Sequence, residues 1–250
     1  MARYGMVIDL DRCTGCGACV VACAVENNIP PTPPQGDERK GLAWVRIYRA
    51  DRPDDGPGPR AVFLPVPCQH CQKDTPCLTV CPQNAVDRDP KTGIVDQVPA
   101  RCLGCRYCMA ACPYRARVFT WWDPSWPEGM EEALNPDVAP RMRGIAEKCN
   151  FCHGRYQAAR ARAAAEGRDA LRPGEYRTAC AEACPTGAIV FGDLDDETSE
   201  AARLARGPRA FRLLERLGTE PSVFYLSDRP WVRRLGQTVL EHGESGGGRG

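Results

Sequence analysis

Cysteine is the residue whose number and spacing in this chain point most directly to chemistry. The sequence contains 16 cysteines, which form four groups: Cys13, Cys16, Cys19 and Cys23; Cys68, Cys71, Cys77 and Cys81; Cys102, Cys105, Cys108 and Cys112; and Cys149, Cys152, Cys180 and Cys184. The first and third groups have the C-x2-C-x2-C-x3-C spacing that holds iron–sulfur clusters. At four thiolates per cluster, the count predicts four 4Fe–4S clusters with no cysteine left over. The chain is therefore predicted to carry electrons.

Three other uses of cysteine fit this pattern less well. A disulfide scaffold is usually a short secreted chain, and repeated C-x2-C pairs place thiols too close in sequence for a set of bridges. Structural zinc takes two C-x2-C pairs separated by a longer loop, without further closely spaced cysteines. Thioredoxin-like redox chemistry needs a single C-x-x-C. Iron–sulfur clusters are the favoured interpretation, with zinc as the alternative.

Composition indicates a loop-rich chain of one or two domains, with 24 Gly, 23 Pro and 43% hydrophobic residues among 250. No segment approaches the roughly 18 apolar residues of a membrane-spanning helix, so no direct membrane span is predicted. The first ten residues contain neither an apolar signal core nor a twin-arginine pair. The chain is therefore predicted not to direct its own export.

The formal net charge of +1 changes when clusters are bound, because coordinated thiolates and oxidised cores together bring it to about −7. Basic residues lie beside the third and fourth groups: Arg101, Arg106, Arg115, Arg117, Arg141, Arg143 and Lys148. The ordinary interpretation is solvated surface charge, and the alternative is that some of them offset cluster charge and raise reduction potentials. They alternate with acidic residues and are not interleaved with aromatic ones, so no nucleic-acid partner is predicted.

Short elements are expected around the cysteines. We expect strands over residues 3–9, 44–49 and 223–226, a hairpin over 85–98, and helices over 18–26, 155–168 and 204–217. The helix over 155–168 is either a surface helix or a docking element for a partner. Cys81-Pro82 and Cys184-Pro185 each begin the same turn into a short strand, and such internal repeats indicate duplicated ferredoxin modules.

The three histidines do not form a catalytic site. His70 and His153 lie in cysteine loops, and His242 lies in the tail. His70 is interpreted as a loop residue hydrogen-bonded to the backbone, with ligand exchange or proton relay as the alternative. No nucleophile–base pair, nucleotide-binding glycine loop or carboxylate pair stands out. The chain is predicted not to be an enzyme by itself, and no catalytic residue is assigned.

The order of the four groups, with the fourth one split, resembles the iron–sulfur subunits of the complex iron–sulfur molybdoenzymes. These include the electron-transfer subunits of dimethyl sulfoxide, polysulfide and tetrathionate reductases. The resemblance covers residues 3–226. Residues 112–119 (CPYRARVF), 147–152 (EKCNFC) and 221–226 (PSVFYL) are also similar to the iron–sulfur module of alternative complex III, which oxidises quinol.

This resemblance implies crossed ligation, in which the fourth cysteine of a group serves the cluster of the paired group. Four ligand sets follow: set one is Cys13, Cys16, Cys19 and Cys184; set two is Cys149, Cys152, Cys180 and Cys23; set three is Cys68, Cys71, Cys77 and Cys112; and set four is Cys102, Cys105, Cys108 and Cys81. The implied fold is α+β, with two interleaved bacterial dicluster-ferredoxin-like modules, loop insertions and a helical C-terminal tail. The first module would comprise residues 1–29 and 145–192, the second 60–120, the connecting insertions 30–59 and 121–144, and the C-terminal extension 193–250.

The implied function is electron transfer between a molybdopterin-containing catalytic subunit and an integral membrane anchor subunit that binds quinone. Set one would face the first partner, and set four the second. The chain would be membrane-associated through its partners, either periplasmic after co-export with a twin-arginine partner or cytoplasmic. The alternatives are a stand-alone polyferredoxin and the iron–sulfur subunit of a quinol-oxidising complex like alternative complex III.

Overall fold

The chain folds into short helices and strands joined by loops. The computed structural model describes residues 2–34, 36, 41–53, 56 and 58–238. The helices are α1 (Ala18–Glu26), α2 (Pro76–Thr79), η1 (Pro99–Arg101), α3 (Tyr107–Ala111), η2 (Met130–Ala133), α4 (His153–Ala165), α5 (Ala179–Glu182), α6 (Glu200–Ala205), η3 (Glu215–Leu217) and α7 (Pro230–Leu235). The strands are β1 (Tyr4–Asp9), β2 (Arg46–Asp51), β3 (Ala61–Val66), β4 (Val86–Arg88), β5 (Val95–Gln97), β6 (Val118–Phe119), β7 (Ala146–Glu147), β8 (Ile189–Asp193), β9 (Ala210–Phe211) and β10 (Val223–Leu226). This mixture agrees with the predicted α+β class.

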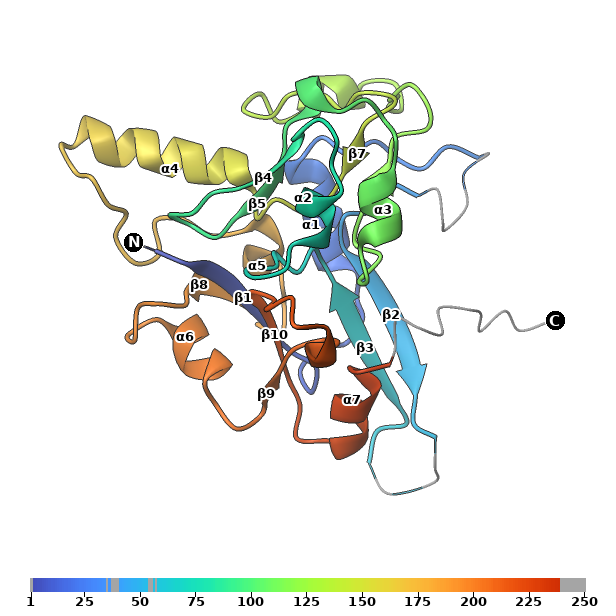
Figure 1. The fold of residues 1–250 in the computed structure, drawn as a ribbon, viewed down its shortest axis with the longest axis vertical. Helices are drawn as coiled ribbons and strands as arrows, with labels where there is room; N and C mark the ends of the chain where they lie inside the picture. The colour runs from blue at the N-terminus through green and yellow to red at the C-terminus, as the bar shows by residue number, and fades with distance from the viewer. Residues whose placement is uncertain (1, 35, 37–40, 54–55, 57, 239–250) are drawn as a thin grey trace.

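A four-stranded sheet brings a strand from the N-terminal part of the chain together with strands from its C-terminal part (Figure 1). Its strand order is β8-β1-β10-β9, with β1 antiparallel to β8 and parallel to β10. Met6 and Ile8 of β1 belong to the main core with Tyr225, whereas Val7 packs in a second cluster with Leu194. Because both faces of β1 are covered, the strand is buried at all its positions. The sheet therefore holds the segment that leads into the first cysteine group.

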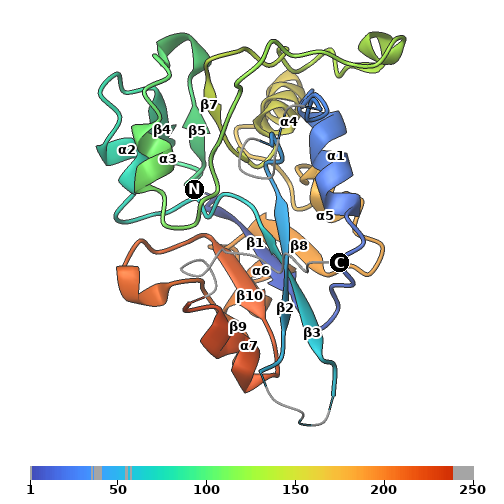
Figure 2. The ribbon, with the colours of Figure 1, turned by 90° about the vertical axis from the view of Figure 1, so that its right-hand side faces the viewer.

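Two pairs of helices carry cysteines from different groups (Figure 2). Helix α1, with Cys19 and Cys23, contacts α5, which carries Cys180. Helix α2, with Cys77, contacts α3, which carries Cys108. Figure 2 shows α2 and α3 on one side of the molecule and α1 and α5 on the other. Groups one and four thus lie together, as do groups two and three.

Most of the predicted elements are confirmed. The helix over 18–26 is α1, the strands over 3–9 and 223–226 are β1 and β10, the hairpin over 85–98 holds β4 and β5, and the helix over 155–168 is α4. Strand β2 begins and ends two residues later than the strand predicted over 44–49. Its partner β3 was not predicted. Helix α4 buries Tyr156, Ala159 and Ala163 along one face. It projects from the body at the upper left of Figure 1.

The predicted helix over residues 204–217 is wrong. Helix α6 ends at Ala205, and the chain continues through Gly207 and Pro208 into β9 and then η3. Proline has no N–H for a helical hydrogen bond, and its ring clashes with the preceding turn. The apolar positions that resembled a helix face are buried in the core instead, at Phe211, Leu213 and Leu214.

The tail is correspondingly less helical than predicted. Of the extension over 193–250, residues 239–250 lie outside the described part, and the rest contains α6 and α7 together with β9 and β10. Tyr225 of β10 is fully buried. Its hydroxyl donates to the Pro65 carbonyl at 3.1 Å and accepts from Gln69 Nε2 at 3.2 Å. The tail is thereby attached to the residue that follows Cys68.

None of the helices in the described part of the chain combines the length and the apolar composition that a membrane crossing requires.

Candidate iron–sulfur centres

The loops of the first and third cysteine groups share a backbone feature. Gly15 and Gly104 each precede the second cysteine of a group, with φ of +71° and +73°. A Cβ at Gly15 would come within 2.5 Å of the Phe63 ring, and one at Gly104 within 2.7 Å of the Gly144 carbonyl oxygen. Glycine satisfies both the left-handed backbone and the lack of space. These tight turns allow one short loop to present three closely spaced thiols.

The turns that begin at Cys81-Pro82 and Cys184-Pro185 share a backbone hydrogen bond to the cysteine sulfur, in agreement with the predicted repeat. The Ala85 N–H donates to Cys81 Sγ at 3.2 Å, and the Ala188 N–H donates to Cys184 Sγ at 3.2 Å. Burial by itself raises the pKa of Cys81, but backbone N–H groups outweigh it and lower the pKa below its usual value. The pKa of Cys184 is lowered in the same way, with the Thr186 hydroxyl adding to the backbone donors. Both turns therefore favour a thiolate.

Eight cysteines line two cavities. Cys68, Cys71, Cys77 and Cys112 line the first, together with Val95, Tyr114 and Ala116. Cys81, Cys102, Cys105 and Cys108 line the second, together with Ala85, Val86 and Ala146. Each cavity takes three cysteines from one group and the fourth from the other. These combinations coincide with sets three and four.

The other eight cysteines approach one another across the whole length of the chain. Cys13 and Cys19 lie near Cys184, close enough for their charges to interact. Cys23, at the end of the first group, lies near Cys149, Cys152 and Cys180. These neighbours are the ones expected for sets one and two.

Neighbouring sets also adjoin one another. Three pairs of thiols from different sets lie close enough for their charges to interact: Cys19 with Cys180, Cys149 with Cys68, and Cys108 with Cys77. They connect set one to set two, set two to set three, and set three to set four. Cys16 of set one and Cys105 of set four are exposed, whereas Cys68, Cys71, Cys149, Cys152 and Cys180 are buried. The four sets thus form a row whose two outer members reach the surface.

Buried thiols in this row hold their protons strongly in the absence of iron. Burial raises the pKa of Cys19, Cys112 and Cys152 to about 11, and that of Cys180 to about 12. Coordination to iron requires the thiolate, so cluster binding releases these protons. No three His, Cys, Asp or Glu side chains of the described residues are placed to hold a single metal ion. In the second cavity, four thiols surround an apolar space and a backbone N–H donates to one of the sulfurs, an arrangement that fits a 4Fe–4S cluster.

His70 behaves as predicted. The Val95 N–H donates to its Nδ1 at 3.0 Å, and its ring stacks on Phe151 with centroids 3.6 Å apart. Burial, together with the positive charge of Lys148, holds the pKa of His70 well below its usual value, so the ring is neutral. His153 Nδ1 lies 2.7 Å from Asp96. The remaining histidine, His242, lies outside the described residues.

Three segments match families of iron–sulfur domains. Residues 4–25 match a 4Fe–4S binding domain. Residues 59–126 and 101–188 each match a 4Fe–4S dicluster domain. Together these segments include every cysteine group, and they agree with the predicted presence of ferredoxin-like 4Fe–4S domains.

Known relatives match nearly the whole chain. The iron–sulfur cluster-binding subunit of menaquinone reductase from Nitratidesulfovibrio vulgaris is 54% identical over 242 residues, which is 96% of this chain and 94% of that protein. A putative iron–sulfur subunit of dimethyl sulfoxide reductase from Halobacterium salinarum is 37% identical, over 98% of this chain and 88% of that protein. The arsenate respiratory reductase iron–sulfur subunit of a Shewanella species is 33% identical, over 90% of this chain and 96% of that protein. The chain belongs to this family of iron–sulfur subunits. The predicted resemblance is confirmed, together with the function in electron transfer and the 4Fe–4S cofactors.

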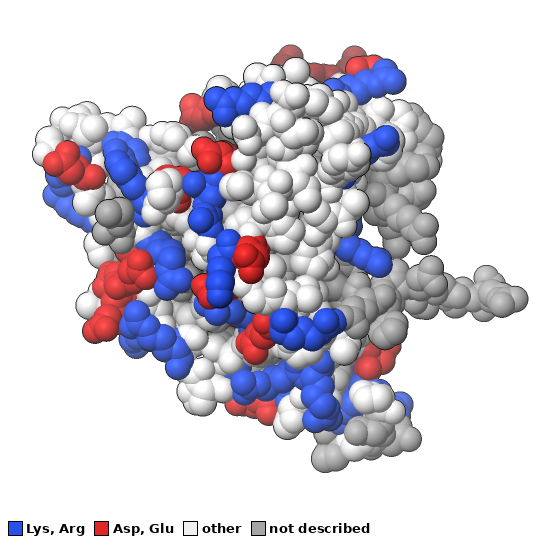
Figure 3. Space-filling view, in the orientation of Figure 1, with Lys and Arg blue, Asp and Glu red and all other residues white. Residues whose placement is uncertain are grey.

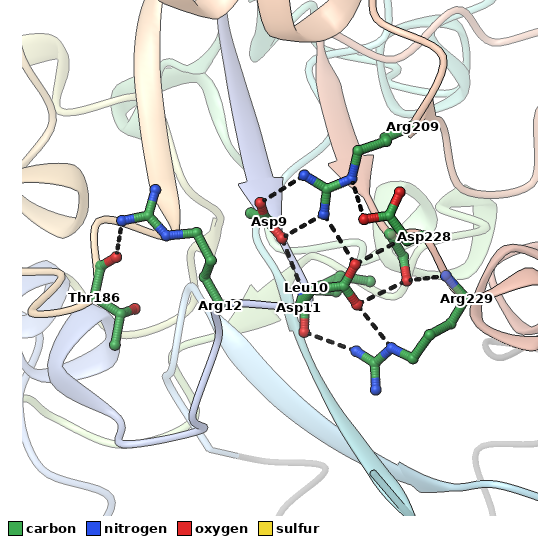
Figure 4. Close-up of polar contacts among 9 residues, drawn as sticks. Asp9, Leu10, Asp11, Arg12, Thr186, Arg209, Asp228 and Arg229 are labelled. Atoms are coloured by element: carbon green, nitrogen blue, oxygen red, sulfur yellow. Dashed lines mark hydrogen bonds and ion pairs between the residues drawn. The ribbon is translucent and has the colours of Figure 1, made fainter. Parts of the chain in front are cut away.

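In this iron–sulfur subunit, the segment just before Cys13 is fixed by residues of the tail (Figure 4). Asp11 accepts hydrogen bonds from Arg209 at 2.9 Å, Arg229 Nε at 2.7 Å, Ser227 Oγ at 3.0 Å and the Asp228 N–H at 2.7 Å. Burial by itself raises the pKa of Asp11, but these donors and the Arg229 charge outweigh it and lower the pKa. The carboxylate is therefore ionised at neutral pH. This network could not be predicted from local sequence patterns, because its members lie about 200 residues apart in the chain.

Replacing Asp11 with asparagine should lower the free energy of unfolding by about 1–3 kcal/mol, since Arg229 loses its carboxylate partner and Arg209 loses one of the three carboxylates around it. Because the Asp11 pKa is lowered on folding, the wild-type advantage is complete above the unfolded pKa near 4 and disappears as pH falls through the folded value. Anaerobic urea unfolding at several pH values above 5 should show the same difference between the two proteins throughout.

The matched control for this variant is Asp195→Asn. Asp195 is half exposed and forms a single ion pair with Arg3 at 3.0 Å, so its replacement should cost well under about 1 kcal/mol. Equal effects of the two substitutions would contradict the structural role of Asp11.

Proposed function

We propose that this subunit conducts electrons between a molybdopterin-containing catalytic subunit and an integral membrane subunit that binds quinone. One observation carries the proposal: the four cysteine sets adjoin one another in a row, and a cysteine is exposed at each end. A row of this kind joins the side of the molecule that carries α1 and α5 to the side that carries α2 and α3 (Figure 2). When bound, the clusters supply one-electron carriers, and the chain holds them in order and shields them from water.

We propose the sixteen cysteines as the ligands, with the memberships of sets one to four given above. The support is local: each proposed set gathers around one cavity or one group of interacting thiols. The proposed modules are residues 1–29 with 145–192, and 60–120, connected by 30–59 and 121–144 and followed by 193–250. The β1–β8 pairing and the contact of α1 with α5 support the first module.

Apolar side chains beside both exposed cysteines support a partner at each end. Val21 and Val25 are each 64% exposed on α1, which follows Cys16. Leu103 is 57% and Tyr107 64% exposed on either side of Cys105. Figure 3 shows few charged side chains around α2 and α3, whereas charged residues crowd over α4, α6 and α7. Exposed apolar residues that gather at a redox end are typical of a surface that another protein covers.

The names of the relatives favour a quinone-linked complex. The relative with 54% identity is a subunit of menaquinone reductase, and a relative with 38% identity is a subunit of an Hdr-like menaquinol oxidoreductase. Menaquinone is therefore the quinone we propose. The chain would act without catalytic residues of its own and would associate with the membrane through its anchor partner, on either the periplasmic or the cytoplasmic side. A quinol-oxidising complex like alternative complex III is the second candidate.

Affinity purification of the tagged protein from its native membranes should test this assignment. We expect a larger molybdenum-containing chain and a membrane-embedded chain to co-purify with it, and a menaquinol analogue to equilibrate with its cluster signals. The Leu103→Glu protein should no longer co-purify with the membrane chain but should keep the molybdenum chain. The Val21→Glu protein should show the opposite result, because each substitution places a charge on one apolar end.

Two results would contradict the proposal. A wild-type protein that purifies alone, as a 27.4 kDa carrier, would favour the stand-alone polyferredoxin. Loss of the same partner in both charge variants would contradict the assignment of one partner to each end.

A further inference from the structure

Of the basic residues that lie beside the cysteine groups in sequence, two are buried in the structure. Arg117 is 3% exposed and Lys148 is 2% exposed. Arg101, Arg106, Arg115 and Arg143 are exposed, and Arg141 is partly buried in an ion pair with Glu147 at 3.1 Å. Surface charge is therefore the correct interpretation for most of this group, but not for Arg117 and Lys148.

The charge of Lys148 is compensated by its surroundings. Its ammonium group donates to the Val95 carbonyl oxygen and, at 3.0 Å, to the Cys149 carbonyl oxygen. The Asp96 carboxylate also lies near enough for its pKa to be lowered by the Lys148 charge. Lys148 thus connects β5 to the fourth cysteine group, and its positive charge is shared with a neighbouring acid.

Arg117 has a different environment. Its Nη1 donates to Gln97 Oε1 at 2.7 Å, but its Nε and Nη2 are buried without a hydrogen-bond partner among the described residues. Nor does any carboxylate in the described part of the chain form an ion pair with it. A buried guanidinium with two unused donors is costly unless negative charge lies next to it.

The negative charge available to Arg117 comes from cysteine sulfurs. Cys77 and Cys108 are its strongest charge partners, followed by Cys68. Arg117 lines the cavity of set three with Cys77 and Cys68, and Gln97, which accepts the hydrogen bond from its Nη1, lines the cavity of set four with Cys108. The guanidinium therefore lies between the two cavities.

We propose that Arg117 is a positioning charge that raises the reduction potentials of the clusters held by sets three and four above the values they would otherwise have. This inference rests on the ligand sets proposed above. Reduction adds one negative charge to a cluster, and a fixed positive charge beside it favours the reduced form. Hydrogen bonds from unused N–H donors to cluster or cysteine sulfur act in the same direction. Since arginine does not deprotonate in proteins, its effect holds across the physiological pH range.

Potentiometric titration followed by electron paramagnetic resonance tests this role in the anaerobically purified full chain. The wild-type protein should show four midpoint potentials. In Arg117→Gln, two of them should fall, each by about a tenfold change in the ratio of reduced to oxidised cluster at a fixed potential, which is about 59 mV for one electron. The other two should stay unchanged. Arg117→Lys keeps the charge and should leave all four closer to wild type than Arg117→Gln does.

The control is Arg115→Gln, because Arg115 is exposed and lies two residues away on the same loop. It should move no potential. If the Arg117→Gln protein fails to assemble four clusters, Gln97→Glu tests the role of the charge instead. It replaces the amide that accepts from Arg117 Nη1 with a carboxylate, which neutralises the guanidinium without removing it. The set-three potential should then fall.

Several outcomes would overturn the proposal. In a fully loaded Arg117→Gln protein, the ratio of reduced to oxidised cluster at a fixed potential could change less than twofold for every cluster. The potentials could also fall equally in Arg117→Lys and Arg117→Gln, or the set-three potential could stay unchanged in Gln97→Glu. A wild-type protein without four clusters would instead contradict the ligand sets. The two failures are therefore distinguishable.

Discussion

Cys184→Ser should perturb the cluster that is bound mainly by the first cysteine group, at the opposite end of the sequence. Cys184 lies near Cys13 and Cys19, and its sulfur accepts the Ala188 N–H. Serine oxygen is a poorer ligand for iron than thiolate, so the iron content should fall from about sixteen per chain toward about twelve. Iron analysis and paramagnetic resonance of the reduced protein measure the loss.

Two matched variants make this result specific. Cys81→Ser changes the same kind of turn, with the Ala85 N–H on its sulfur, and should perturb set four instead. Cys112→Ser should perturb set three and leave the set-one signal largely unchanged. If Cys184→Ser altered only the cluster bound by Cys149, Cys152 and Cys180, the crossed ligation would be wrong.

Tyr225→Ala should cause the largest loss of stability among core substitutions in the tail. Tyr225 is fully buried between the sheet and the β2–β3 hairpin, and its hydroxyl bonds Pro65 and Gln69. Truncation of a large buried aromatic residue costs about 3–5 kcal/mol, a large share of the roughly 5–15 kcal/mol that stabilises a typical domain. Gln69 lies beside Cys68, so iron should also leave set three faster during anaerobic urea unfolding.

Phe224 provides the control for this substitution, because it is the preceding residue of β10 and is only partly buried. Phe224→Ala should cost clearly less, and Tyr225→Phe should cost about 1–3 kcal/mol through the loss of the hydroxyl alone. A midpoint of unfolding that falls equally in Tyr225→Ala and Phe224→Ala would contradict the role assigned to Tyr225.

The sequence was most informative where local spacing determines geometry. Two of the C-x2-C loops have a left-handed glycine before their second cysteine, and His70 and Phe151 hold the same backbone conformation in the other two. The close cysteine spacing allowed α1 and the turns after Cys81 and Cys184 to be predicted directly. Residues 204–217 misled the prediction, because apolar spacing alone does not separate a helix from a strand with adjoining core residues. Pro208 was the signal that should have excluded the helix.

Long-range contacts were beyond the reach of local patterns. Nothing in the segment around Arg117 distinguishes it from its exposed neighbour Arg115, because burial depends on which segments pack over each side chain. The network around Asp11 is a similar case, as its partners Arg209 and Arg229 are brought to it only by the pairing of β1 with β10. The sequence identified these residues as basic or acidic but not as buried or paired.

The place of β1 in the sheet has a consequence for biosynthesis. Strand β1 is made well before its sheet neighbours β8 and β10. At about 5–20 residues per second, the first cysteine group waits roughly 10 to 40 s for the strands beside it and for Cys184. During that time its thiols are open to oxidation and to the wrong metal. In the proposed ligand sets, the clusters of sets one and two can therefore be completed only after Cys180 and Cys184 have been made, whereas sets three and four need only residues 68–112. Reducing conditions or a protecting chaperone would preserve the thiols of the first group in the meantime.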